Sequence, residues 1–145
     1  MCNSSQGQTV SKTQSATHGV HHLGLSVIDV KQAAQFFCEI LHFKQVGEKP
    51  DYPAIFVSDG SVMLTLWQTQ DQPVAFDRHQ NIGLHHFALT VKGTSQLVEL
   101  YQRLLQHQDV EIEFAPESLG NTPAQHLMCR IPGGLRMELI ALPGE

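Results

Sequence analysis

Two short segments of the chain alternate large apolar residues with histidine, small or hydroxyl residues. Residues 20–27 read VHHLGLSV, and residues 84–91 read LHHFALTV, 64 positions later. An alternation of period two is typical of a β-strand whose two faces meet different surroundings. In the first segment Leu23 and Leu25 fall on one face and His22 on the other, and the second segment divides in the same way. The pattern predicts two equivalent strands, each opening a repeated unit.

A helical pattern follows each of these strands. Apolar residues recur at spacings of three and four over residues 33–41 and again over residues 97–105. This is the periodicity of an amphipathic helix. We expect Asp29 to cap the first helix and Thr94 or Ser95 to cap the second, because their side chains can accept hydrogen bonds from free backbone N–H groups.

Three more extended segments follow each helix. They cover residues 43–46, 54–58 and 62–67, then 110–114, 126–131 and 135–142, with turns expected at Pro50, Pro53, Asp59, Gly60, Pro116, Pro123 and residues 132–134. The order predicts an α+β fold of two tandem βαβββ modules, about residues 20–68 and 84–142. The modules would form a cupped mixed sheet with the helices on its outer face. Residues 68–83 lack periodicity and are expected to link the modules.

The composition of the chain limits the number of domains, the kinds of partner and the cellular location that we expect. The 145 residues suit one domain, over residues 19–145, and residues 1–18 are rich in Ser, Thr and Gln and are expected to form a polar tail. Nine Lys and Arg against fourteen Asp and Glu give a net charge of -5, which disfavours nucleic acid as a partner. No apolar run could span a membrane and no signal-peptide pattern occurs, so we expect no membrane partner and a cytoplasmic location. Cys2, Cys38 and Cys129 are widely spaced and are expected to be reduced thiols.

The last strand places a carboxylate between apolar neighbours. Met137 and Leu139 fall on the face expected to meet the helix, so Glu138 points the other way. If the modules are built alike, His22 and His86 point to the same side. Two imidazoles and one carboxylate suit a divalent transition metal and leave coordination positions open for a substrate.

A structural interpretation of these residues also exists. A single histidine at the start of a strand is more often a hydrogen-bonded core or edge residue than a ligand. Two histidines at equivalent positions, together with a Glu whose burial would otherwise be costly, favour the metal site. His21 and His85 face the opposite way by parity and are expected to pack or to support the ligands.

Four segments of the chain resemble the vicinal oxygen chelate superfamily. They are His22-x-x-Leu25-x-Val27, Phe36-Phe37-x-x-x-Leu41-x-Phe43, His86-x-x-Leu89-x-Val91 and Pro132-Gly-Gly-Leu-Arg-Met-Glu138-Leu. The superfamily includes glyoxalase I, fosfomycin-resistance enzymes, methylmalonyl-CoA epimerase, extradiol dioxygenases and bleomycin-resistance proteins. The resemblance covers about residues 20–142. It implies a divalent metal (Fe, Ni, Zn or Mn) on His22, His86 and Glu138, with Glu138 as the catalytic candidate.

The chain departs from the family pattern at two positions. Glyoxalase I adds a carboxylate on the last strand of its first module, where this chain has Thr65. This disfavours a glyoxalase I reaction and favours the three-ligand arrangement of the dioxygenase and fosfomycin branches. His42 stands where the family usually has Gly after the helix, and His tolerates the left-handed conformation that such a turn needs.

Other residues on the presumed site face are candidates for substrate contact. They are Thr65, Trp67, Thr90 and Arg136. Trp67 could stack on a planar substrate or simply belong to the core. Arg136 could pair with an anionic substrate group or with a surface acid.

The resemblance implies a metalloenzyme that chelates vicinal oxygens of a small substrate, of the lyase, isomerase or dioxygenase type. A fosfomycin-type thiol transferase and a metal-free binding protein of the bleomycin-resistance type are the alternatives. Family members pair their modules within one chain or between two. Because residues 68–83 are long enough to reach a second subunit, we expect a homodimer in which His22 of one chain faces His86 and Glu138 of the other.

Overall fold

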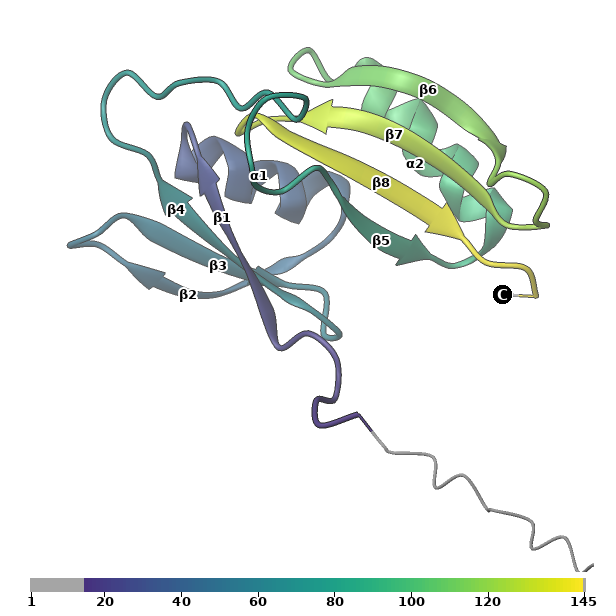
Figure 1. Ribbon diagram of the computed structural model, residues 1–145, viewed down its shortest axis with the longest axis horizontal. Helices are drawn as coiled ribbons and strands as arrows, with labels where there is room; N and C mark the ends of the chain where they lie inside the picture. Colours follow the sequence, from purple (N-terminus) through teal and green to yellow (C-terminus); the bar gives the residue numbers. More distant parts are fainter. Residues whose placement is uncertain (1–14, 145) are drawn as a thin grey trace, which may run out of the picture.

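The computed structural model describes residues 15–144 and contains two repeats of the same five elements (Figure 1). The first repeat is β1 (His22–Val27), α1 (Val30–Ile40), β2 (Lys44–Lys49), β3 (Ala54–Ser58) and β4 (Met63–Gln68); the second is β5 (Phe87–Val91), α2 (Gly93–Gln106), β6 (Glu111–Ser118), β7 (Gln125–Ile131) and β8 (Leu135–Ala141). The first fourteen residues of the expected tail, with Cys2, lie outside the described residues. Residues 15–18 belong to no helix or strand.

Each module forms its own four-stranded mixed sheet. The strand orders are β1-β4-β3-β2 and β5-β8-β7-β6, in which the first strand of each module pairs in parallel with the last and the other pairs are antiparallel. The α+β fold of two βαβββ modules is thus confirmed, with the strands in two sheets that are not hydrogen-bonded to each other. The sheets lie side by side in Figure 1, and α2 lies behind the second.

One hydrophobic core joins the two modules. Leu25 and Val27 of β1 are buried together with Leu97 and Leu104 of α2 in the same cluster. The ring centroids of Phe37 in α1 and Phe87 in β5 lie 6.4 Å apart, so aromatic packing crosses the junction. The helices therefore lie in the space between the modules. Each sheet has a second face, which the helices do not cover.

The two helices begin differently. Asp29 caps α1 as expected, since its carboxylate accepts hydrogen bonds from the N–H groups of Lys31 and Gln32, both at 2.9 Å. The expected caps of α2 are wrong: Thr94 and Ser95 lie inside the helix, which begins at Gly93. Gly93 has a φ of +70°, which lets the chain turn from β5 into the helix before either residue is reached.

Two expected breaks lie inside strands. Pro116 falls within β6, an edge strand, beside a register shift between Phe114 and Glu117, where a missing N–H is tolerated. Gln68, expected to begin the linker, ends β4. Its side chain accepts a hydrogen bond from the N–H of Val30 at 2.8 Å and donates one to the carbonyl of Ile28. Gln68 thereby ties β4 to the start of α1.

The turn after α1 and the cysteines follow expectation. His42 adopts the left-handed conformation, with a φ of +59°. Cys38 and Cys129 are free thiols. Burial raises the pKa of Cys129 to about 12, which keeps its thiol protonated and unreactive.

None of the helices within residues 15–144 is long and apolar enough to cross a lipid bilayer.

Candidate functional site

The sheet of the second module brings His86 and Glu138 together. Ala88 of β5 pairs with Glu138 of β8, and His86 lies directly before β5. His86 Nε2 is 3.2 Å from Glu138 Oε2. The glutamate is 7% exposed, whereas Met137 and Leu139 on either side of it pack into the core. The parity of β8 therefore sends the carboxylate to the face that the helix does not cover.

A third side chain at this site, His126 of β7, was not anticipated from the sequence. Its Nδ1 lies 2.5 Å from Glu138 Oε1, so the two carboxylate oxygens have different imidazole partners. A signal for it exists in the sequence. The turn that pairs Ile131 with Leu135 sets the register of the hairpin. Counting outward from that turn places His126 diagonally next to Glu138.

The charge balance around Glu138 is unusual. Within residues 15–144, the side chains within bonding distance of this buried carboxylate are His86 and His126. The nearby guanidinium of Arg136 is held by Glu113 instead, with Nη2 2.7 Å from Oε2. A buried carboxylate without a permanent cation is costly. The donor set fits a divalent cation, which would supply the missing positive charge.

Arg136 is thus already paired inside the protein. Its Nε lies 2.9 Å from both oxygens of Glu113, and Arg130 adds a longer contact at 3.3 Å. The hydrogen bond from Arg136 holds the pKa of Glu113 below its ordinary value. Arg136 Nη1 also lies 3.3 Å from His85 Nδ1. Loss of hydration, with the charge of Arg136 as a second cause, lowers the pKa of His85.

His22 lies in the other module, away from this pair. It is exposed at the start of β1, and its Nδ1 is 2.9 Å from His21 Nδ1. β1 begins at the lower end of the first sheet in Figure 1, whereas β5 begins near the middle of the molecule. Across residues 15–144, no three His, Cys, Asp or Glu side chains are grouped to hold a metal ion. A single chain therefore brings together two of the three expected ligands.

His21 and His85 each contact the next histidine instead of facing away from it, which is compatible with the expected supporting role. His85 Nδ1 lies 2.8 Å from His86 Nδ1, and His21 contacts His22 in the same manner. Both residues precede the strands, which begin at His22 and Phe87. The alternation of faces does not extend to residues outside a strand.

Thr65 occupies the position in the first module that Glu138 occupies in the second. Gly24 of β1 pairs with Thr65, as Ala88 of β5 pairs with Glu138. Thr65 is buried, and Trp67 Nε1 donates a hydrogen bond to its hydroxyl at 3.0 Å. The indole also packs against Tyr52 at a centroid distance of 5.3 Å. In the first module aromatic rings therefore lie next to this position. In the second module the equivalent position holds a carboxylate.

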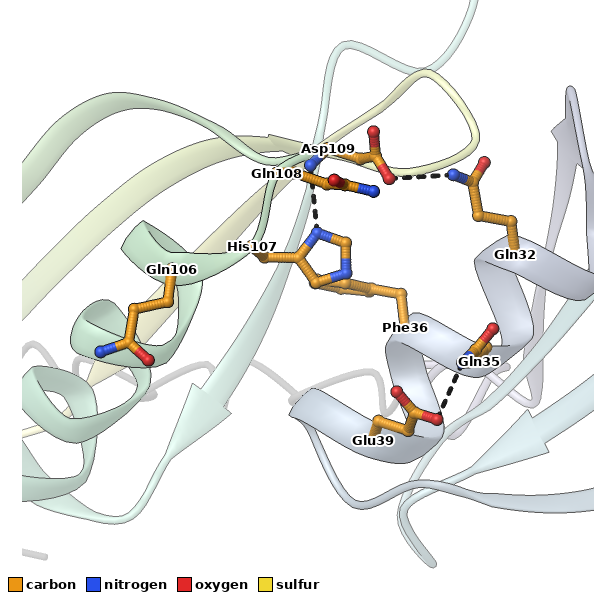
Figure 2. Close-up of a pocket in the computed structure, with 8 residues that line it drawn as sticks. All are labelled: Gln32, Gln35, Phe36, Glu39, Gln106, His107, Gln108 and Asp109. Atoms are coloured by element: carbon orange, nitrogen blue, oxygen red, sulfur yellow. Dashed lines mark hydrogen bonds between the residues drawn. The ribbon is translucent and has the colours of Figure 1, made fainter.

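Two cavities lie within residues 15–144, and none of the three expected metal ligands lines either of them. A groove of about 810 Å³ between β1, the linker and the β7–β8 turn reaches Arg136 and His85, but His22, His86 and Glu138 do not line it. Thr90 is exposed on β5 and does not line it either. The second cavity, about 430 Å³, lies between α1 and the end of α2 (Figure 2). Several of its polar groups bond to one another: Gln32 of α1 bonds to Asp109, beyond α2, at 3.1 Å, so the cavity lies at a junction between the modules.

Comparisons with known proteins agree with this architecture. Comparison with curated protein sequences gives no significant match. Among solved structures, a glyoxylase/bleomycin resistance protein/dioxygenase domain from Frankia sp. EAN1pec matches with a TM-score of 0.75 and 19% identity, covering 87% of this chain and 98% of its own. Fosfomycin resistance protein FosX from Listeria monocytogenes matches with a TM-score of 0.69 and 15% identity, covering 88% and 96%.

A lactoylglutathione lyase from Agrobacterium tumefaciens is similar in fold, with a TM-score of 0.67 and 18% identity over 88% of this chain and 96% of its own. Identities this low establish the fold alone. The family model of the Glyoxalase/Bleomycin resistance protein/Dioxygenase superfamily matches residues 19–139, which is most of the chain. Together with the two βαβββ modules, this match places the chain in that superfamily, the vicinal oxygen chelate group.

Proposed function

We propose that this protein is a metal-dependent enzyme of the superfamily, acting on a small substrate with vicinal oxygens. The observation that carries the proposal is the buried Glu138 carboxylate, whose Oε2 lies 3.2 Å from His86 Nε2 and whose bonded partners among the described residues include no Lys or Arg. Glu138 supplies the negative charge, and His86 and His22 are the neutral ligands.

The third ligand, His22, comes from a second copy of the chain in this proposal. β1 and β5 are edge strands of their sheets within one chain. His22 is exposed at the start of β1, and His86 lies directly before β5. The linker between the modules also carries apolar side chains that have no cover, among them Val74 and Ile82, which are 94% and 107% exposed. Uncovered apolar surface of this kind favours association.

A divalent ion at this site would act as a Lewis acid that polarises the vicinal oxygens of the substrate. The hydroxyl of Thr65 is too weak an acid and too weak a base to replace a carboxylate, so the first module provides no second acid or base at the position equivalent to Glu138. This favours dioxygenase or fosfomycin-type thiol-transfer chemistry over the glyoxalase I reaction, with isomerisation, epimerisation or elimination as the remaining classes.

The test is metal binding by the purified protein. We expect about one divalent ion per chain by elemental analysis, and a steep loss of affinity in Glu138→Ala and His86→Ala by calorimetry. His79→Ala and Glu39→Ala remove the same side-chain types from exposed positions and serve as matched controls. Iron would indicate oxygenase chemistry, whereas nickel, zinc or manganese would indicate lyase, isomerase or transferase chemistry. A wild-type protein that binds no metal would favour the metal-free binding function instead.

A further inference from the structure

We propose that His126 is a positioning residue that holds the Glu138 carboxylate ready for the metal. The inference rests on the proposed function, because it assigns a role toward the same ion. His126 Nδ1 lies 2.5 Å from Glu138 Oε1, while Glu138 Oε2 lies 3.2 Å from His86 Nε2. One oxygen of the carboxylate is thereby tied to β7, and the other is turned toward the metal-ligating imidazole.

The position of His126 is fixed by the sheet. It lies on β7 opposite Ile140 of β8, two residues from Met128, which is directly opposite Glu138. Its side chain is 13% exposed. The ring of Phe114 on β6 packs against it at a centroid distance of 4.9 Å. An imidazole held by one strand and an aromatic ring from its neighbour has little freedom to leave the carboxylate.

The contact at 2.5 Å requires one of the two groups to donate a proton to the other. In the proposed arrangement Nδ1 is the donor, because a carboxylate that binds a metal ion only accepts hydrogen bonds. The other nitrogen, Nε2, is directed toward Glu117, at 3.9 Å from Oε1, on the exposed side. The inward nitrogen of His126 is therefore bonded to Glu138, and in this proposal His126 is a partner of the ligand.

Such a partner strengthens metal binding by ordering the ligand beforehand. A Glu side chain that is already fixed loses less rotational freedom when the ion binds. Loss of a group that orients a metal ligand typically lowers affinity by about 10–100-fold. We expect an effect of this size from His126, exerted through Glu138.

The experiment compares His126→Asn with His126→Leu. The Asn side-chain amide can place its N–H near the position of Nδ1, whereas Leu fills similar space with no donor. By calorimetry with Mn²⁺ and with Zn²⁺, we expect His126→Leu to bind about 10–100-fold more weakly than wild type. We expect His126→Asn to recover most of that loss. Glu117→Gln alters the contact at the other ring nitrogen and is expected to bind as wild type does.

A second measurement needs no variant to fold. Nitrogen–proton NMR of the imidazoles in the metal-free protein should show His126 protonated at Nδ1. A neutral ring protonated only at Nε2 would overturn the inference. Equal affinity in His126→Leu and wild type would also overturn it, as would an Asn variant as weak as the Leu variant. A wild type that binds none of Mn²⁺, Zn²⁺, Ni²⁺ and Fe²⁺ would overturn the proposed function itself, whereas a wild type that binds metal as tightly as His126→Leu does would overturn the role of His126 alone.

Discussion

At the scale of single residues, one sheet face carries a partly buried carboxylate, Glu113, and a buried one, Glu138, with different partners. Glu113 is bonded to the guanidinium of Arg136, a permanent cation, and its pKa is held below the ordinary value of 4.5. Glu138 is bonded to two imidazoles. The first carboxylate is therefore satisfied within the protein, and the second is the one suited to an added cation.

The Glu113–Arg136 pair predicts a specific dependence of stability on pH. Because its folded pKa is lowered, the pair stabilises the protein fully above pH 4.5 and progressively less as the pH falls below that value. We expect Glu113→Gln to cost about 1–3 kcal/mol near neutral pH, since it leaves the Arg136 charge unpaired. Thermal unfolding between pH 7 and pH 3 should show the difference from wild type shrinking below pH 4.5.

The exposed pair Glu99–Arg103 is the control for this measurement. Its atoms approach to 2.6 Å, but both side chains are largely in solvent. We expect Glu99→Gln to cost no more than about 0.5 kcal/mol. An equal cost for the two variants, or a Glu113→Gln effect that persists unchanged at pH 3, would contradict the assignment of the stabilisation to the partly buried Glu113–Arg136 pair.

Parity within a strand is enough to foresee how Glu138 is presented, because its neighbours must face the core. It is not enough to foresee His126 or the Glu113–Arg136 pair. Both contacts depend on the register between strands: the β7–β8 turn sets it for His126, and β6, which carries Glu113, contains two register shifts. Local alternation carries no information about such shifts. The sequence therefore indicates which face of the sheet carries Glu138, and the pairing of the strands decides which side chains meet it there.

At the scale of elements, the repeated pattern predicts every strand and helix of residues 20–142 in the right order. The β3 boundaries, Ala54–Ser58, agree residue for residue. The errors lie at element ends, where one backbone torsion outweighs the pattern. Gly93 starts α2 early, and Gln68 extends β4 by using its side chain to hold the start of α1.

The contrast between the helix starts predicts unequal effects of the same substitution. Asp29→Ala removes the acceptor for the N–H groups of Lys31 and Gln32 and should lower the free energy of unfolding by about 1 kcal/mol. Lys92 holds the corresponding place before α2 but makes no capping bond through its side chain. Chemical denaturation should find Lys92→Ala near neutral. Equal losses in the two variants would mean that the Asp29 bonds contribute little.

At the scale of the whole molecule, the two modules share a core but not a sheet. The helices fill the space between them, and His22 and His86 belong to separate sheets. The sequence identifies both modules and both histidines. It carries no information on whether the modules of one chain face each other across the site, because the linker is long enough for either arrangement.

Complementation of inactive variants tests the two-chain site. Neither His22→Ala nor Glu138→Ala should bind metal normally alone. If an equal mixture is unfolded and refolded, random pairing makes half of the dimers mixed, and each mixed dimer holds one intact site of two. About a quarter of the wild-type metal sites should return, measured by calorimetry. No recovery in demonstrably mixed dimers would place all three ligands in one chain.

The pairing of the first strand of each module with its last has a consequence for how the chain folds. β2, β3 and β4 pair with their neighbours in sequence, as do β6, β7 and β8. β1 instead pairs with β4, and β5 with β8, and each of these partners is the last strand of its module to be synthesised. Such non-local pairing forms late and slowly. During synthesis His126 and Glu138 can therefore meet as soon as the β7–β8 hairpin forms, whereas His86 and Glu138 come together only when β8 has joined β5.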